Sequence, residues 1–185
     1  MFLYNEVQKR EANQERVRVG LIGAGKFGSM FLSQVPFTIG LEVISIVDIC
    51  VENAKKNCRD VGWTKEQIES VLFFDNLKKM VSQTKIDVLV EATGDPVEGT
   101  KHALIAIEQG LDIVMVNVEA DVLSGPYLAK EAEKAGIVYS MAYGDQPALT
   151  TELVEWARAS GFNVVAAGKG CLLYTSPSPR DSLSS

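Results

Sequence analysis

The sequence of 185 residues lacks the features that mark several large classes of protein. Lysine and arginine are nowhere clustered and the formal net charge is −6, so a partner that binds through a nucleic-acid backbone is not expected. No apolar run reaches the length of a membrane span, and residues 1–16 are charged and hold no apolar signal core. We therefore expect a cytoplasmic protein with no nucleic-acid or membrane partner.

Cysteine and histidine are also scarce. Cys50, Cys58 and Cys171 are odd in number and lack metal-ligand spacing, which is typical of unpaired thiols in a reducing compartment, and no metal site is predicted. The single histidine, His102, falls inside a helical pattern and is interpreted as a surface or packing residue rather than an acid or base. The remaining composition, 46% hydrophobic and 23% charged, is that of an ordinary globular domain.

A dinucleotide-binding pattern is present in residues 17–48. An apolar strand, residues 17–22, runs into G-x-G-x-x-G at the junction of strand and helix, formed by Gly23-Ala24-Gly25-Lys26-Phe27-Gly28. Gly23 would permit the tight turn, Gly25 would let a diphosphate approach the backbone, and Gly28 would let the helix pack on the strand. On its own, this motif often marks only a glycine-rich turn. Here a strand, the turn, a helix, a second strand and an acid follow one another at the spacing of a dinucleotide-binding unit. We predict that its six residues contact a cofactor, with the phosphates on free N–H groups at the helix N-terminus.

The acid that completes this pattern is Asp48, which ends the apolar strand 41–47. It lies about 20 residues beyond Gly28, where a carboxylate can accept hydrogen bonds from the adenosine ribose. Alternatively, Asp48 is an ordinary solvated acid at the end of a strand. Its charge would repel a 2′-phosphate, and the two residues that follow offer no arginine to neutralise one. We predict NAD as the cofactor, with NADP possible through a lysine of the following helix.

Strands and helices alternate along the rest of the chain. Helices are expected over an opening segment to about residue 15 and over 52–59, 97–109, 126–135 and 148–159. A further helix is expected directly after Asp75, with Asp75 as its cap. Further strands are expected over 71–74, 85–90, 113–116, 137–140 and 163–167. Strands that are apolar on both faces indicate a parallel sheet covered by helices on each side. We predict an α/β protein with a doubly wound parallel sheet of the Rossmann type, truncated before its substrate domain.

The carboxyl ends of the strands are where a doubly wound sheet binds its ligand. Ala92, Thr93 and Gly94 follow one buried strand and would pass beside the nicotinamide ribose, unless they form only a turn. Asn117 follows the next strand, and its amide could hold the nicotinamide or a substrate carbonyl. These four residues are candidate cofactor contacts.

Three further residues are candidate substrate contacts. Glu119 is interpreted first as part of an acidic turn that leads a helix, and second as a contact to substrate. Asp145 either caps the helix 148–159 or contacts substrate. Lys169, which follows the strand 163–167, is a plausible cation for a substrate carboxylate.

The chain divides into four stretches. Residues 1–15 form a helical arm, residues 16–145 the dinucleotide-binding domain, and residues 146–170 the start of a substrate and dimerisation region. Residues 171–185 begin with a run that resembles a translated sequencing adaptor, so we expect an artefactual, disordered tail and a natural protein cut at about Gly170. A genuine Ser/Pro-rich terminus is the alternative.

Four runs of sequence resemble a known family. They are residues 17–28, Val90-Glu91-Ala92-Thr93-Gly94, Val116-Asn117-Val118-Glu119-Ala120-Asp121 and Gly144-Asp145-Gln146-Pro147. With these runs, the chain resembles the homoserine-dehydrogenase-like NAD(P)-dependent oxidoreductases that carry a C-terminal SAF domain, over roughly residues 5–170. The resemblance implies hydride transfer between the nicotinamide and a small polar alcohol or aldehyde, and a homo-oligomer when full length. It also implies that Gly23, Gly25, Gly28 and Asp48 bind the cofactor, and that Thr93, Gly94 and Asn117 line its nicotinamide side.

The chain departs from homoserine dehydrogenases at Val118, where they have a lysine, and their catalytic acid and lysine lie in a region absent here. Catalytic residues are therefore not assigned, and the fragment is expected to bind NAD and turn over little. Two alternatives stay open. One is a non-catalytic NAD(H)-sensing module. The other is a sugar oxidoreductase of the glucose-fructose oxidoreductase type, which usually has Glu-Lys-Pro where this chain has Asn117-Val118-Glu119-Ala120.

Overall fold

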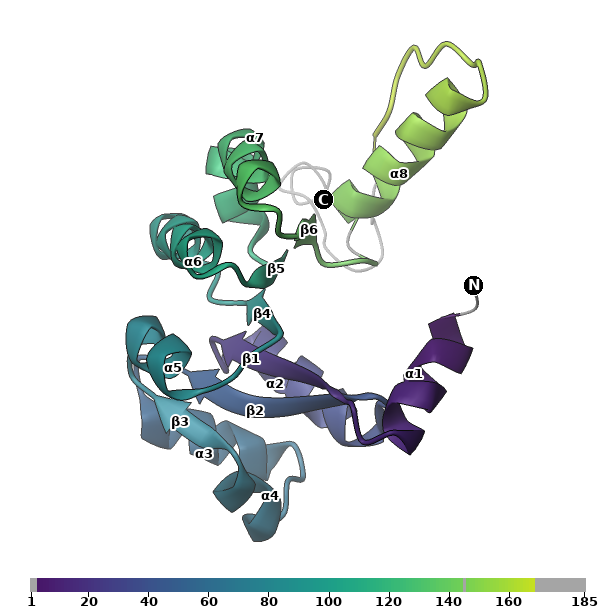
Figure 1. Cartoon of the computed structure of the whole chain (residues 1–185). Helices are drawn as coiled ribbons and strands as arrows, with labels where there is room; N and C mark the ends of the chain where they lie inside the picture. Colours follow the sequence, from purple (N-terminus) through teal and green to yellow (C-terminus); the bar gives the residue numbers. More distant parts are fainter. Residues whose placement is uncertain (1–2, 145, 169–185) are drawn as a thin grey trace, which may run out of the picture. The chain divides into compact units, whose positions relative to one another are not determined.

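The computed structural model describes residues 3–144 and 146–168 (Figure 1). The chain forms two compact units that divide between Ala142 and Tyr143. Among the described helices, none combines the length and the apolar character that crossing a bilayer requires. The two units are described separately.

The first unit is built on a sheet in which the described residues form six parallel strands in the order β3-β2-β1-β4-β5-β6. The strands are β1 (Val17–Ile22), β2 (Leu41–Val47), β3 (Leu72–Phe74), β4 (Val88–Glu91), β5 (Asp112–Met115) and β6 (Tyr139–Met141). The direction of winding reverses between β1 and β4, so the carboxyl ends of these two strands border a crevice. The predicted doubly wound α/β sheet is confirmed.

Helices cover both faces of this sheet because successive strand residues point to opposite sides (Figure 1). Leu21 of β1 belongs to a buried cluster with Leu32, whereas the next residue, Ile22, belongs to a second cluster with Leu89. The first cluster is completed by α2 (Lys26–Gln34) and α3 (Val51–Asp60), and the second by α5 (Leu77–Gln83), α6 (Pro96–Gln109) and α7 (Val118–Ala135). The inner strands β1, β2 and β4 are thus buried on both sides over most of their length, which explains their continuous apolar sequences.

The remaining helices are α1 (Leu3–Ala12), the 3₁₀ turn η1 (Val35–Phe37), α4 (Lys65–Ser70) and, in the second unit, α8 (Gln146–Ala159). The predicted N-terminal arm, α1, contacts the domain through Glu11, whose Oε2 accepts the Gly40 N–H at 3.0 Å. Buried Trp63 precedes α4 and donates its indole N–H to the Leu32 carbonyl at 2.7 Å. This bond connects the end of α2 to the β2–β3 connection.

Helix α7 begins eight residues earlier than the sequence pattern predicts, at Val118 rather than Pro126. Proline lacks the N–H that a helix interior uses and its ring crowds the preceding turn, so it is normally expected near a helix start. Here Asn117 caps the helix, and buried Ala120 and Leu128 hold its two halves against the sheet. Burial on either side therefore outweighs the cost of Pro126.

Two smaller expectations are also wrong. Helix α5 is capped by Asn76, whose Oδ1 accepts the Lys78 N–H at 2.9 Å, whereas the predicted cap, Asp75, pairs with Lys79. The expected strand 163–167 does not form, since the described residues 162–168 have no regular secondary structure. Val165 in this segment is almost fully exposed, and the segment does not pair with a strand of the described sheet.

An ion pair at the amino edge of the sheet makes stability pH-dependent. Arg18 donates from Nε to Asp87 Oδ2 at 2.9 Å and from its backbone N–H to the same oxygen at 2.8 Å. The hydrogen bonds from the Arg18 side chain hold the pKa of Asp87 below its ordinary value. A carboxyl whose pKa is lower in the folded state stabilises the fold above its unfolded pKa, and this contribution is lost as the pH falls through the folded pKa.

We expect Asp87→Asn to lower the free energy of unfolding at neutral pH by at most about 1 kcal/mol, because the carboxylate is partly exposed and screened by water. The difference from wild type should shrink at acidic pH, as the pH falls through the lowered pKa of Asp87 and the wild-type carboxyl becomes protonated. Urea unfolding at neutral and at acidic pH measures it. An equal difference at both values would contradict the prediction.

Candidate functional site

A cleft of ≈ 700 Å³ opens at the carboxyl edge of the sheet, where the winding reverses. Its walls come from the turn after β1, the residues after β2, the start of α5, and the loop from β4 into α6. Among the predicted site residues, five line it: Gly23, Gly25, Asp48, Ala92 and Thr93. The topology thus brings together groups that lie up to 70 residues apart in sequence.

The turn after β1 depends on two glycines. Gly23 has φ +91°, a conformation that side chains disfavour, and a Cβ there would lie 3.0 Å from the Ala92 carbonyl. A Cβ on Gly28 would lie 2.1 Å from the Gly23 carbonyl oxygen. These distances agree with the predicted tasks of the two residues, the tight turn and the close helix packing.

The N-terminus of α2 faces open space. Gly25 is its N-cap, no side chain caps the helix, and no acidic residue lies in its first turn, which holds exposed Lys26 and Phe27. A Cβ on Gly25 would meet nothing within 4 Å. The first N–H groups of a helix attract anions, so this opening fits a diphosphate.

Asp48 joins the turn to the β2–α3 connection. Its Oδ2 accepts the N–H of buried Ala24 at 2.9 Å, and its Oδ1 accepts the Cys50 N–H at 2.9 Å. Asn57 of α3 adds a bond that the sequence did not suggest, from Nδ2 to the Ala24 carbonyl at 2.7 Å. Each Asp48 oxygen keeps a free lone pair, which a ribose hydroxyl can use.

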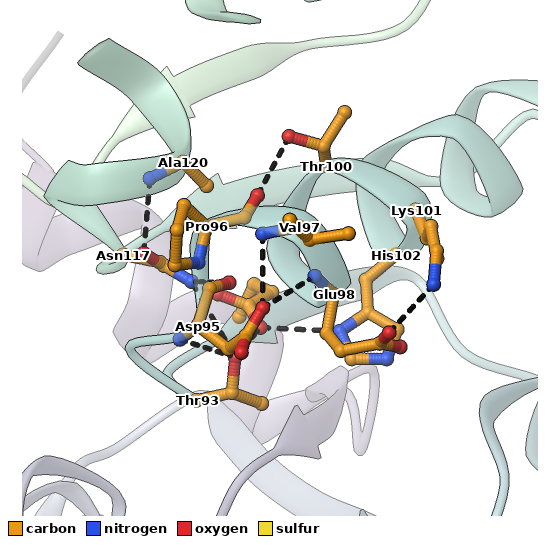
Figure 2. Close-up of polar contacts among 11 residues, drawn as sticks. Thr93, Asp95, Pro96, Val97, Glu98, Thr100, Lys101, His102, Asn117 and Ala120 are labelled. Atoms are coloured by element: carbon orange, nitrogen blue, oxygen red, sulfur yellow. Dashed lines mark hydrogen bonds and ion pairs between the residues drawn. The ribbon is translucent and has the colours of Figure 1, made fainter. Parts of the chain in front are cut away.

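The loop from β4 into α6 is held by Asn117 (Figure 2). Asn117 donates from Nδ2 to the Asp95 carbonyl at 2.8 Å and accepts the Ala120 N–H at Oδ1, 3.1 Å away. Asp95 in turn caps α6 by accepting the N–H groups of Val97 and Glu98. Asn117 is buried and does not line the cleft, so its amide shapes the loop, and its contact with nicotinamide stays a prediction.

Other predicted residues are placed less centrally. Gly94 has φ +77° and open surroundings, which suits a tight turn beside Thr93. Glu119 is exposed in the first turn of α7 and is not part of the cleft wall. Asp145 and Lys169 lie outside the described residues.

The sequence reasoning missed a pair of titratable groups in the cleft wall. Glu91, the last residue of β4, is fully buried, and its Oε1 lies 3.1 Å from Nδ1 of His102, which lines the cleft. His102, expected to be a surface or packing residue, thus packs in the cleft wall with one ring nitrogen facing Glu91. A signal was available, because His102 shares the helical stripe of buried Gly99, Ala103 and Ala106, which faces the end of the sheet.

A comparison with models of protein families shows which family the chain belongs to. The model described as the NAD-binding domain of homoserine dehydrogenase matches residues 19–142, which contain every residue of the cleft. The chain belongs to this family. It is an NAD-binding oxidoreductase domain, and the predicted resemblance is confirmed for this part. A second model, the catalytic domain of oxidoreductase DRL, matches residues 144–182 and so reaches into the tail that was expected to be artefactual.

Solved structures confirm the fold. The WlbA dehydrogenase of Bordetella pertussis, in complex with NADH and UDP-GlcNAcA, matches with a TM-score of 0.59 at 20% identity over 79% of this chain and 40% of its own. The myo-inositol dehydrogenase of Lactobacillus casei, in complex with NAD(H) and myo-inositol, matches with a TM-score of 0.56 at 18% identity, over 76% of this chain and 42% of its own. This chain therefore spans about two fifths of these proteins. No curated protein sequence matches it.

Proposed function

We propose that the cleft binds NAD with the diphosphate at the N-terminus of α2 and the adenosine ribose on Asp48, in a protein that transfers hydride between the nicotinamide and a small polar alcohol or aldehyde. The open floor at Gly25, beside an uncapped helix end and within the same cleft as a carboxylate, carries the proposal. The bound cofactor would supply the hydride chemistry, and this chain would hold and orient it. Ala92 and Thr93 would then border the nicotinamide half.

The same proposal assigns the domains. Residues 16–145, which end at Asp145, would bind the cofactor, and residues 146–170 would begin a substrate and dimerisation region that contains Lys169. The change of compact unit after Ala142 and the oxidoreductase DRL match over residues 144–182 support this division. Glu119 would contact substrate only if that region covered the start of α7.

The choice between NAD and NADP is expected to depend on Asp48. In wild type, NADH should bind at least about tenfold more tightly than NADPH, because the carboxylate accepts bonds from the ribose and repels a 2′-phosphate. Asp48→Asn should lower NADH affinity by about tenfold, the worth of a hydrogen bond to a charged group, and should raise NADPH affinity. Titration followed by nicotinamide fluorescence measures both.

Asp75→Asn is the matched control for this test. Asp75 lines the same cleft but its carboxylate is paired with Lys79 at 2.8 Å. Its substitution should leave the preference for NADH unchanged. Equal affinity for both nucleotides in wild type and in Asp48→Asn would exclude the role given to Asp48.

A sugar or polyol oxidoreductase is the second candidate. Its support is the likeness of fold to the WlbA dehydrogenase, whose structure contains UDP-GlcNAcA, and to a myo-inositol dehydrogenase. The run Asn117-Val118-Glu119 in place of Glu-Lys-Pro counts against it. NAD titrations in the presence of homoserine or of myo-inositol separate the two. Tighter binding with myo-inositol alone would favour the second candidate.

A further inference from the structure

Two titratable side chains that the proposed cofactor contacts do not use face each other in the cleft wall. Glu91 is fully buried at the end of β4, and its Oε1 accepts the Thr93 hydroxyl at 2.5 Å as well as facing His102 Nδ1 at 3.1 Å. Its Oε2 has no hydrogen-bond partner within the described chain. The His102 side chain is 15% exposed and borders the cleft.

A charge on Glu91 would require a counter-ion. A buried carboxylate without a partner is costly, and in the described ranges the imidazole of His102 is the one basic group within ion-pair distance. Lys101, the neighbouring cation on α6, is exposed and pairs with Glu98 at 2.7 Å. A carboxylate and an imidazolium joined through Nδ1–H would satisfy both groups.

This pairing leaves the other ring nitrogen free. An imidazolium carries a proton on both nitrogens, and Nε2 of His102 makes no hydrogen bond to the rest of the described protein. Because His102 borders the cleft, a charged N–H donor is available to a ligand there. Such a donor suits an electron-rich acceptor, which a dinucleotide carries on its phosphates, sugars and bases.

We propose that Glu91 and His102 link the binding of the dinucleotide to protonation, with His102 donating Nε2–H to an acceptor on the bound cofactor and Glu91 positioning the ring. This inference rests on the proposed binding of NAD in the same cleft. When His102 loses a proton, Nδ1 keeps its hydrogen and its hydrogen bond to Glu91. Nε2 then carries a lone pair in place of N–H and can no longer donate to the acceptor on the cofactor. Affinity for the cofactor therefore falls as the pH rises.

Other charged groups around the imidazole do not mimic this effect. Those that line the same cleft are Asp95, Glu98 and Lys101 from α6 and its cap, and Asp48, Asp75 and Lys78 from the other walls. Behind the pair, Tyr139 donates to Asp121 at 2.9 Å, and burial raises its pKa above the ordinary tyrosine value, so it stays neutral. Between about pH 5 and about pH 8, histidine is the side chain expected to change charge.

The experiment measures NADH affinity over that pH range. Wild type should lose at least about tenfold in affinity from the acidic to the basic end, the worth of a hydrogen bond to a charged group. His102→Gln should show the weak affinity at every pH. Lys101→Gln, which removes a neighbouring positive charge from the same cleft, should keep the wild-type dependence on pH.

Two further readouts keep the test independent of folding defects in His102→Gln. His102→Lys retains a positive charge throughout the range, so its affinity should not fall with pH. Calorimetry of wild type in two buffers of different ionisation enthalpy should show proton uptake when NADH binds near the basic end of the range. Circular dichroism verifies that each variant is folded.

The outcomes are distinguishable. Binding of NADH by wild type without proton uptake, or an unchanged pH dependence in folded His102→Gln, overturns this inference and leaves the proposed function standing. Failure of wild type to bind NADH at any pH overturns the proposed function and this inference with it. Proton uptake that disappears in His102→Lys supports the link.

Discussion

Gly28→Ala is expected to lose both stability and affinity for NADH. A Cβ at this position would lie 2.1 Å from the Gly23 carbonyl oxygen, which is backbone and cannot move unless α2 leaves β1. Forcing a methyl group into such a space costs about 3 kcal/mol, more than the roughly 1 kcal/mol by which alanine favours a helix. The displaced turn should also weaken NADH binding by at least about a hundredfold. Urea unfolding and NADH titration measure the two effects.

Gly25→Ala is the matched comparison, because it adds the same methyl group three residues away. Gly25 has φ −70°, which alanine tolerates, and a Cβ there meets nothing within 4 Å. Because alanine is a poorer N-cap than glycine, the free energy of unfolding should fall by about 0.5 to 1 kcal/mol, well below the loss expected for Gly28→Ala. NADH affinity should fall at least about tenfold, since the methyl group occupies the approach of the diphosphate. Unchanged NADH affinity in Gly25→Ala would contradict the position given to the phosphates.

Gly99→Ala is expected to destabilise the protein although it replaces glycine inside a helix. Helix propensity alone predicts a gain of about 1 kcal/mol. A Cβ would lie 2.5 Å from Asn117 Nδ2 and 2.8 Å from Ala120 Cβ, so the residue that holds the Asp95 loop and caps α7 would be displaced. We expect a net loss of about 2 kcal/mol from the clash and the broken hydrogen bonds, measured by urea unfolding.

A double-mutant cycle tests this cause. If Gly99→Ala acts through Asn117, its cost should be much smaller in an Asn117→Ala background, where the displaced amide no longer exists. Additive costs in the double variant would show that Asn117 is not the group affected. A stabilised Gly99→Ala protein would show that propensity outweighs the contact.

The sequence predicted the parts of the site that local chemistry determines. The glycine turn and Asp48 were recognisable because their residue types and spacing are required by one backbone geometry, and the structure places Gly23, Gly25 and Asp48 around one cleft. The strand order followed from alternating apolar runs and right-handed crossovers. Such features are encoded over short stretches of chain.

The parts that escaped prediction depend on contacts between distant elements. The pairing of Glu91 with His102 exists because α6 is packed against β4, and neither residue alone indicates it. The continuation of α7 through Pro126 depends on Ala120 and Leu128 burying against the sheet, which a propensity rule does not include. The absent strand at 163–167 is the converse case, an apolar pattern without a neighbouring strand among the described residues.

The hydrogen bond that buries Trp63 against α2 has a practical consequence for spectroscopy. The chain contains two tryptophans, one in each compact unit, and Trp156 of α8 is 70% exposed. A shielded indole emits at shorter wavelength than one in water, so the blue part of the emission belongs to Trp63 and the red part to Trp156. Unfolding of the nucleotide-binding unit can therefore be followed at the short-wavelength side of the emission, separately from unfolding of α8 and without an added label.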